Sequence, residues 1–228
     1  MAPQMYQIRD TIVNMFLIVE EQGLTLIDTG TAGAAKAVTR TLAKHGFQPA
    51  DVKTILITHA DPDHAGGAAA LKALTGAPIY ASAGEALALA EGRPPRQPKA
   101  GPLGRQLFKL SERLMPITPV SPVQTLADGD VLPILGGLQV LSTPGHTPDH
   151  LSFYAPAYGV LFAGDSMIST PAGLRFADGP VTWDYALGCE SVRRQAALAP
   201  RWVACGHGPV LEGAAVRFPE FAGGVGVS

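Results

Sequence analysis

The alternation of apolar runs with glycine-rich turns predicts an α/β fold in the first half of the chain. Two apolar runs flank the Glu-Gln-Gly turn at residues 21–23, a pattern typical of a β-hairpin, and the second run ends in TLIDTG at residues 25–30. Residues 34–45 have helical periodicity, and Gly46 is placed to end that helix. The run VKTILIT at residues 52–58 is apolar and β-branched, which favours a strand buried on both faces.

The same pattern continues through the rest of the chain. A helix is predicted over AGGAAALKALTGA at residues 65–77, and a strand over PIYAS at residues 78–82. Three later strand-like runs each lead into a loop that carries glycine and a ligand-type side chain: LQVLSTPG at 138–145, GVLFAGD at 159–165 and WVACGHG at 202–208. A two-sheet core flanked by helices, in a single domain over residues 1–228, is the simplest architecture.

Composition narrows the class of protein. The chain has 228 residues, of which 46% are hydrophobic and 16% charged, as expected for a well-packed globular domain. Its formal net charge of -2 argues against a nucleic-acid partner, which usually requires a strongly basic face. The N-terminus lacks the layout of a signal peptide, and no apolar run approaches the roughly 18 residues of a membrane span. We therefore expect a cytoplasmic protein without a membrane partner.

Ligand-type side chains concentrate in ITHADPDHAGG at residues 57–67, here called the metal loop. His59 and Asp61 stand two residues apart, so in an extended loop their side chains point the same way. The intervening proline then turns Asp63 and His64 toward a second position. Imidazole and carboxylate groups together suit zinc, iron and manganese, so the loop predicts part of a metal site.

Further ligands are expected from other strand ends. His146, Asp165 and His207 each follow an apolar strand and lie beside glycine, which allows the backbone to approach an ion closely. His150 lies four residues after His146, and a supporting role is expected for it. His45 lies near the end of the predicted helix, where a histidine suits the helix dipole.

The ordered motifs HxDxDH, TPGHT, AGD and GHG resemble those of the metallo-β-lactamase-fold hydrolases, from TLIDTG almost to the end of the chain. The resemblance implies a four-layer αββα sandwich with two metal ions at one edge. It places His59, Asp61 and His146 on the first ion, and Asp63, His64 and His207 on the second. Asp165 would bridge the two ions, and Asp28 and His150 would support the ligands without binding the ions themselves.

Asp61 departs from the family's commoner motif, HxHxDH, in which a histidine stands at this position. A carboxylate is a harder ligand than imidazole and is negatively charged, so iron and manganese become alternatives to zinc, which remains the favoured ion. The change also disfavours an assignment to the true β-lactamases.

A two-metal site predicts hydrolysis of a small-molecule substrate. Two cations about 3.5–4 Å apart can share a water and lower its pKa from about 16 toward 7. The resulting bridging hydroxide would attack a lactone, thioester, ester or phosphodiester, and Asp63 would orient the nucleophile and pass its proton. Glyoxalase II-like thioesterases usually add a C-terminal extension, and only FPEFAGGVGVS ends this chain, which disfavours that class. The alternatives are a flavodiiron-like redox protein lacking its flavin domain, and a non-hydrolytic metal-binding protein.

A proline-rich basic insertion interrupts the pattern at about residues 92–116. Leucines at helical spacing predict an amphipathic helix over Leu103–Met115. If this helix is a lid over the site, Arg105, Lys109 and Arg113 would contact an anionic substrate. A helix packed on the core with a solvated basic face, a homodimer contact and a membrane-surface helix are the other interpretations. Tyr185 is a further candidate substrate contact.

Overall fold

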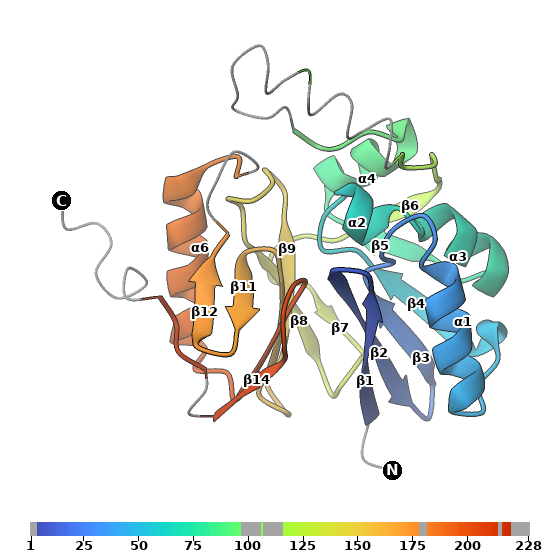
Figure 1. Cartoon of the computed structure of the whole chain (residues 1–228), viewed down its shortest axis with the longest axis horizontal. Coiled ribbons are helices and arrows are strands. Elements are labelled where there is room, and N and C mark those ends of the chain that lie inside the picture. Colours follow the sequence, from blue (N-terminus) through green and yellow to red (C-terminus); the bar gives the residue numbers. More distant parts are fainter. Residues whose placement is uncertain (1–3, 97–105, 107–115, 178–181, 214–215, 220–228) are drawn as a thin grey trace. The chain divides into compact units, whose positions relative to one another are not determined.

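The computed structural model describes residues 4–96, 106, 116–177, 182–213 and 216–219 (Figure 1). The chain divides into two compact units. The N-terminal unit comprises Met1–Pro95 and Gly101–Leu126, and the C-terminal unit comprises Arg96–Ala100 and Ala127–Ser228. The predicted single domain over residues 1–228 stays a prediction, and each unit is described by itself.

The N-terminal unit contains a six-stranded sheet in chain order, coloured blue to green in Figure 1. Its strands are β1 (Gln4–Asp10), β2 (Val13–Glu20), β3 (Gly23–Ile27), β4 (Val52–Leu56), β5 (Ile79–Ala81) and β6 (Val123–Thr125). The first three strands pair antiparallel, and β3 to β6 pair parallel. The predicted hairpin is confirmed as β2–β3, and β1 extends it by a strand that the apolar pattern did not indicate.

The helices of this unit are α1 (Ala35–Lys44), α2 (Pro62–Ala65), α3 (Ala68–Thr75) and α4 (Ala83–Glu91), with a 3-10 turn, η1 (Pro49–Asp51). Both predicted helices are confirmed as α1 and α3. Each is followed by a glycine with positive φ, Gly46 at 80° and Gly76 at 72°, as expected at a helix end. Val38 of α1, Leu71 of α3 and Leu89 of α4 are buried in one core with the sheet.

The prediction that residues 52–58 are buried on both faces is wrong for the start of the strand. Lys53 is exposed and Thr54 is half-buried, whereas the residues from Ile55 to Thr58 are fully buried. Val52, which directly follows η1, is itself buried in the core, so the departure is confined to Lys53 and Thr54.

The C-terminal unit contains a second six-stranded sheet in the order β14-β13-β10-β9-β8-β7. Its strands are β7 (Val131–Leu132), β8 (Leu138–Ser142), β9 (Leu151–Ala155), β10 (Val160–Gly164), β13 (Trp202–Cys205) and β14 (Leu211–Glu212). A separate hairpin, β11 (Met167–Thr170) with β12 (Gly173–Phe176), and the helix α6 (Tyr185–Ala197) complete the unit. The three strand-like runs predicted here are confirmed as β8, β10 and β13.

Parallel pairing brings particular loops to the same edge of each sheet. In the N-terminal unit, β3, β4 and β5 run parallel, so Asp28, the metal loop and Ser82 all follow the carboxyl ends of neighbouring strands. In the C-terminal unit, β10 and β13 run parallel and are followed by Asp165 and by His207. Functional groups of each unit are therefore gathered at one edge of its sheet.

The predicted helix over Leu103–Met115, with Arg105, Lys109 and Arg113, lies outside the described residues. Within the described parts of the chain, no helix has the length and apolar character that crossing a membrane requires.

Candidate metal centre

The metal loop leaves β4 as an extended segment and then turns into α2. Pro62 occupies the first helical position of α2, where its missing N–H costs nothing, so the bend predicted from the sequence is the start of a helical turn. Gly67 N donates to Gly30 O at 3.1 Å, and a Cβ on Gly67 would clash with Thr29 O. The glycines of the loop thus allow it to pack closely on the segment that follows β3.

His59 and Asp61 point the same way, as their two-residue spacing predicts. His59 Nε2 lies 3.6 Å from Asp61 Oδ2, and His59 is fully buried. On the other side of the proline, His64 Nε2 lies 4.0 Å from Asp63 Oδ2. Two ligands with bonds of about 2.0–2.1 Å to a tetrahedral ion stand about 3.3 Å apart. The two imidazole–carboxylate pairs therefore have spacings close to those that a shared ion requires.

Asp28 controls the tautomers of both histidines in the loop. Its carboxylate accepts hydrogen bonds from Thr58 N at 2.8 Å, from Thr58 Oγ1 at 2.8 Å and from His64 Nδ1 at 2.9 Å. A carboxylate can only accept, so His64 carries its proton on Nδ1 and its lone pair on Nε2. Because Thr58 Oγ1 donates its single proton to Asp28, it accepts from His59 Nδ1 at 3.0 Å, which gives His59 the same tautomer. Both Nε2 atoms are therefore in the state that can bind a metal.

Asp28 itself has a strained backbone, with φ of 59°, a left-handed conformation that aspartate and asparagine tolerate better than most residues. It is also nearly inaccessible to solvent. This placement matches the supporting role that the family resemblance implies, and that role stays a prediction.

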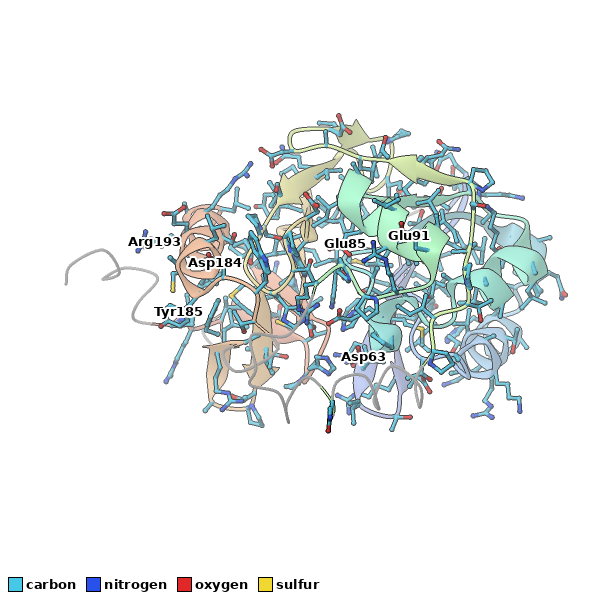
Figure 2. The ribbon with its side chains drawn as sticks, turned by 90° about the horizontal axis from the view of Figure 1, so that it is seen from above. Asp63, Glu85, Glu91, Asp184, Tyr185 and Arg193 are labelled. Carbon is cyan, nitrogen blue, oxygen red and sulfur yellow. The ribbon has the colours of Figure 1, made fainter. Side chains whose placement is uncertain are left out.

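Glu85 was not identified from the sequence, and it reaches the metal loop from α4. Its side chain is fully buried, and its Oε2 accepts a hydrogen bond of 2.7 Å from Ala60 N, between His59 and Asp61 (Figure 2). The stretch SAGE at residues 82–85 has the S-x-x-E pattern of a capping box, which was the available signal. That pattern gives no hint that the carboxylate turns toward another loop.

In the C-terminal unit, one carboxylate oxygen faces two imidazole rings. Asp165 Oδ2 lies 3.2 Å from His207 Nε2 and 3.8 Å from His146 Nε2. Asp165 and His146 are each only 6% exposed. The three side chains come from three loops, yet their donor atoms have the spacing expected of common ligands. The predicted bridging role of Asp165 fits this geometry and stays a prediction.

His150 has hydrogen bonds at both ring nitrogens within this unit. Its Nε2 accepts from Asp165 N at 3.0 Å, and its Nδ1 lies 2.8 Å from Thr143 Oγ1. A ring held in this way orients the backbone of Asp165, and the supporting role expected for His150 stays a prediction.

Arg96 is a second residue that sequence reasoning did not assign to the site. Its guanidinium Nη2 lies 3.3 Å from His146 Nε2, and the side chain is 7% exposed. The basic composition of the insertion marked this region, but nothing in the pattern distinguished Arg96 from the other cations. Arg96 thus brings a buried guanidinium next to a predicted ligand.

Tyr185 is the first residue of α6 and is exposed, with its ring edge-on to Phe176 at a centroid distance of 5.1 Å (Figure 2). Its predicted substrate contact stays a prediction. Cys205 is buried on β13, and burial, together with the neighbouring charge of Asp165, raises the pKa of its thiol well above the ordinary value. Cys189 is also buried. The Cys205 thiol lacks the lowered pKa of a cysteine nucleophile, and the burial of both cysteines denies a substrate access to them.

Comparisons with known proteins point to one family. The family model described as "Metallo-beta-lactamase superfamily" matches residues 8–207. The chain is 31% identical over 170 residues to a hydroxyacylglutathione hydrolase of Albidiferax ferrireducens, covering 73% of this chain and 52% of the relative. It is 28% identical over 227 residues to the probable metallo-hydrolase YflN of Bacillus subtilis, covering 89% of this chain and 83% of the relative.

A solved structure of a metallo-β-lactamase family protein, TTHA1429 from Thermus thermophilus, superposes with a TM-score of 0.69 at 27% identity. The match covers 98% of this chain and 78% of the other. The predicted fold class, an α/β fold of the metallo-β-lactamase type, is confirmed. The chain spans about half the length of the hydroxyacylglutathione hydrolase that it matches.

Proposed function

The chain belongs to the metallo-β-lactamase superfamily, and from this premise we propose that it is a metal-dependent hydrolase that cleaves a thioester or a related ester bond. The observation that carries the proposal is the convergence of His146 Nε2 and His207 Nε2 on Asp165 Oδ2, at 3.8 and 3.2 Å. The three side chains come from three separate loops. Donor atoms from separate loops at this spacing are typical of ligands that share one cation.

We propose that two divalent ions bind the residues that the family motifs indicate. The proposed ligands are His59, Asp61 and His146 for one ion, Asp63, His64 and His207 for the other, and Asp165 for both. When bound, such ions supply Lewis acidity and a water whose pKa is lowered toward about 7. Zinc suits the imidazole-rich set, and the carboxylate of Asp61 keeps iron and manganese as alternatives.

Other side chains of the protein orient the proposed ligands and the attacking water. Asp28 and Thr58 hold the ring nitrogens of the metal loop in one tautomer. Asp63 is half-buried at the start of α2, where its carboxylate can orient a water and accept its proton. His150 holds the backbone of Asp165 through a bond of 3.0 Å. These contacts set the geometry before any substrate binds.

Two observations support a thioester that carries an anionic group as the substrate: the name of a relative and the buried guanidinium of Arg96. The name hydroxyacylglutathione hydrolase describes cleavage of a thioester that carries anionic groups. This similarity weighs against the expectation that a glyoxalase II-like substrate is disfavoured. Arg96, buried beside His146, supports an anionic group on the substrate. A cytoplasmic location, a homodimer, and the lack of nucleic-acid and membrane partners stay predictions.

The test is elemental analysis of the purified protein, followed by a panel of thioester, ester, lactone and phosphodiester substrates. We expect close to two transition-metal ions per chain and the highest kcat/KM on a thioester. Asp165→Ala should lose metal and activity together, whereas Asp149→Ala, an exposed carboxylate of the same unit, should retain both.

A protein that takes up no zinc, iron or manganese would contradict the proposal. Two bound ions without hydrolysis of any panel substrate would favour the non-hydrolytic alternative. Oxygen consumption by an iron-loaded sample, with a suitable electron donor, would favour the redox alternative.

A further inference from the structure

Glu85 places a carboxylate where solvent cannot reach it. The residue lies in the first turn of α4 and is fully buried. Removing a carboxylate from water is costly unless donors compensate the charge, so a buried glutamate indicates a specific arrangement around it. The N-terminal end of α4 provides part of that compensation, because a helix dipole favours negative charge there.

The capping pattern does not account for this glutamate. Ser82 precedes the helix with extended backbone angles, but its side chain makes no cap hydrogen bond. Its buried Oγ has no hydrogen-bond partner within the part of the chain that the structure describes. The S-x-x-E pattern therefore does not serve the usual reciprocal cap on the serine side, and the glutamate carboxylate is directed elsewhere.

The carboxylate is directed to the metal loop. Glu85 Oε2 accepts from Ala60 N at 2.7 Å, and Ala60 is itself fully buried. The two elements meet because β4 and β5 are adjacent parallel strands, with Ile57 N donating to Tyr80 O at 2.9 Å. The loop that follows β4 and the helix that follows β5 therefore start side by side.

We infer that Glu85 is a positioning residue for the metal loop. Its carboxylate holds the peptide that joins His59 to Asp61, and so maintains the 3.6 Å spacing between His59 Nε2 and Asp61 Oδ2. In its ionised form the same carboxylate also stabilises a cation bound by the two neighbouring proposed ligands. The inference rests on the proposed function for the identity of the ligands, but the contact with Ala60 belongs to the protein alone.

Three variants test the inference. Glu85→Ala removes both the acceptor and the charge, whereas Glu85→Gln keeps an acceptor oxygen of the same reach and removes only the charge. Glu91→Gln is the matched control, since Glu91 ends the same helix, is exposed and pairs with Arg93 at the surface (Figure 2). The glutamine variant also guards against a failure of the alanine variant to fold.

The first measurement uses the metal-free protein and follows hydrogen exchange of the Ala60 amide by NMR. We expect protection at Ala60 to fall at least tenfold in Glu85→Ala and to be largely kept in Glu85→Gln and Glu91→Gln. The second measurement is affinity for Co²⁺ by chelator competition, with the visible spectrum reporting ligand geometry. Loss of a group that orients a ligand typically weakens metal binding about 10–100-fold, and we expect this for Glu85→Ala, with partial rescue by Glu85→Gln.

Wild-type protection at Ala60 in Glu85→Ala would overturn the inference. Lost protection with unchanged Co²⁺ affinity and spectrum would also overturn it, because the contact would then be structural only. A wild-type protein that binds no Co²⁺ would overturn the proposed function instead, and the exchange of Ala60 would still decide whether Glu85 holds the loop.

Discussion

Replacing Asp28 with asparagine should weaken one of the two proposed ions selectively. Asparagine has the same shape and tolerates the φ of 59° at this position. Its Oδ1 can still accept from Thr58 N and Thr58 Oγ1, as Asp28 Oδ1 does at 2.8 and 3.0 Å. The amide nitrogen then faces His64 Nδ1 in place of a carboxylate oxygen. An amide N–H can only donate, so His64 must move its proton to Nε2, the atom proposed to bind the metal.

The expected loss of metal affinity follows from the hydrogen bonds of Asp28 that change. Two bonds of Asp28 involve Oδ2: the one to His64, at 2.9 Å, is reversed, and the one from Thr58 Oγ1, at 2.8 Å, is replaced by the bond that this hydroxyl already makes to Oδ1 at 3.0 Å. A hydrogen bond to a charged group contributes about 1.5–3 kcal/mol, which corresponds to roughly ten- to a hundred-fold in metal affinity. The tautomer of His59 depends on Thr58 Oγ1 and should not change. The ion proposed to bind His64 should therefore be lost first, while the other is retained.

The assay is titration of metal-free protein with Zn²⁺ in the presence of a competing chelator, with stoichiometry from elemental analysis. Unfolding free energy of the metal-free variant should stay within about 1 kcal/mol of wild type, since each polar group keeps a partner. Asp10→Asn is the control. Asp10 Oδ2 also accepts from a backbone N–H and a threonine hydroxyl, those of Thr31 at 3.1 and 2.6 Å. Equal affinity of both ions for Asp28→Asn and Asp10→Asn would refute the tautomer argument.

Three further predictions concern other residues. Asp61→His should shift metal preference toward zinc by adding a neutral imidazole, and unchanged selectivity among zinc, manganese and iron would argue against Asp61 as a ligand. Arg96→Gln should raise KM for anionic substrates by about tenfold with little change in kcat, and an equal effect on neutral esters would exclude anion binding by Arg96. Cys205 has a pKa raised first by burial and then by Asp165, so above about pH 8.5 only the unfolded thiol ionises. Unfolding free energy of the metal-free protein should then fall by up to about 1.4 kcal/mol per pH unit, and Cys205→Ala, measured by denaturant between pH 8 and 10, should lack that slope.

Local patterns were sufficient for the main strands and for the candidate ligands. The runs that became β10 and β13 are apolar over their whole length, and burial of such a run does not depend on which strand pairs with it. The runs that became β4 and β8 are interrupted by polar residues but are still apolar enough to predict strands. The metal loop was recognisable because four ligand-type side chains within six residues rarely serve packing alone. The short turn α2 was missed, since four residues carry too little periodicity to distinguish a helix from a loop.

The groups that support the ligands were decided by tertiary structure. Asp28 was expected near the loop only through the family resemblance, and its contact with His64 spans 36 positions. Glu85 reaches Ala60 across 25 positions and Arg96 reaches His146 across 50, with no sequence motif that links either pair. The contacts of Asp28 and Glu85 exist because parallel pairing places the ends of β3, β4 and β5 side by side. The contact of Arg96 with His146 exists because Arg96 belongs to the C-terminal unit, whereas the residues up to Pro95 belong to the N-terminal unit. A side chain's partner across such separations depends on strand order and register, and neither is encoded in the local alternation of apolar and polar residues.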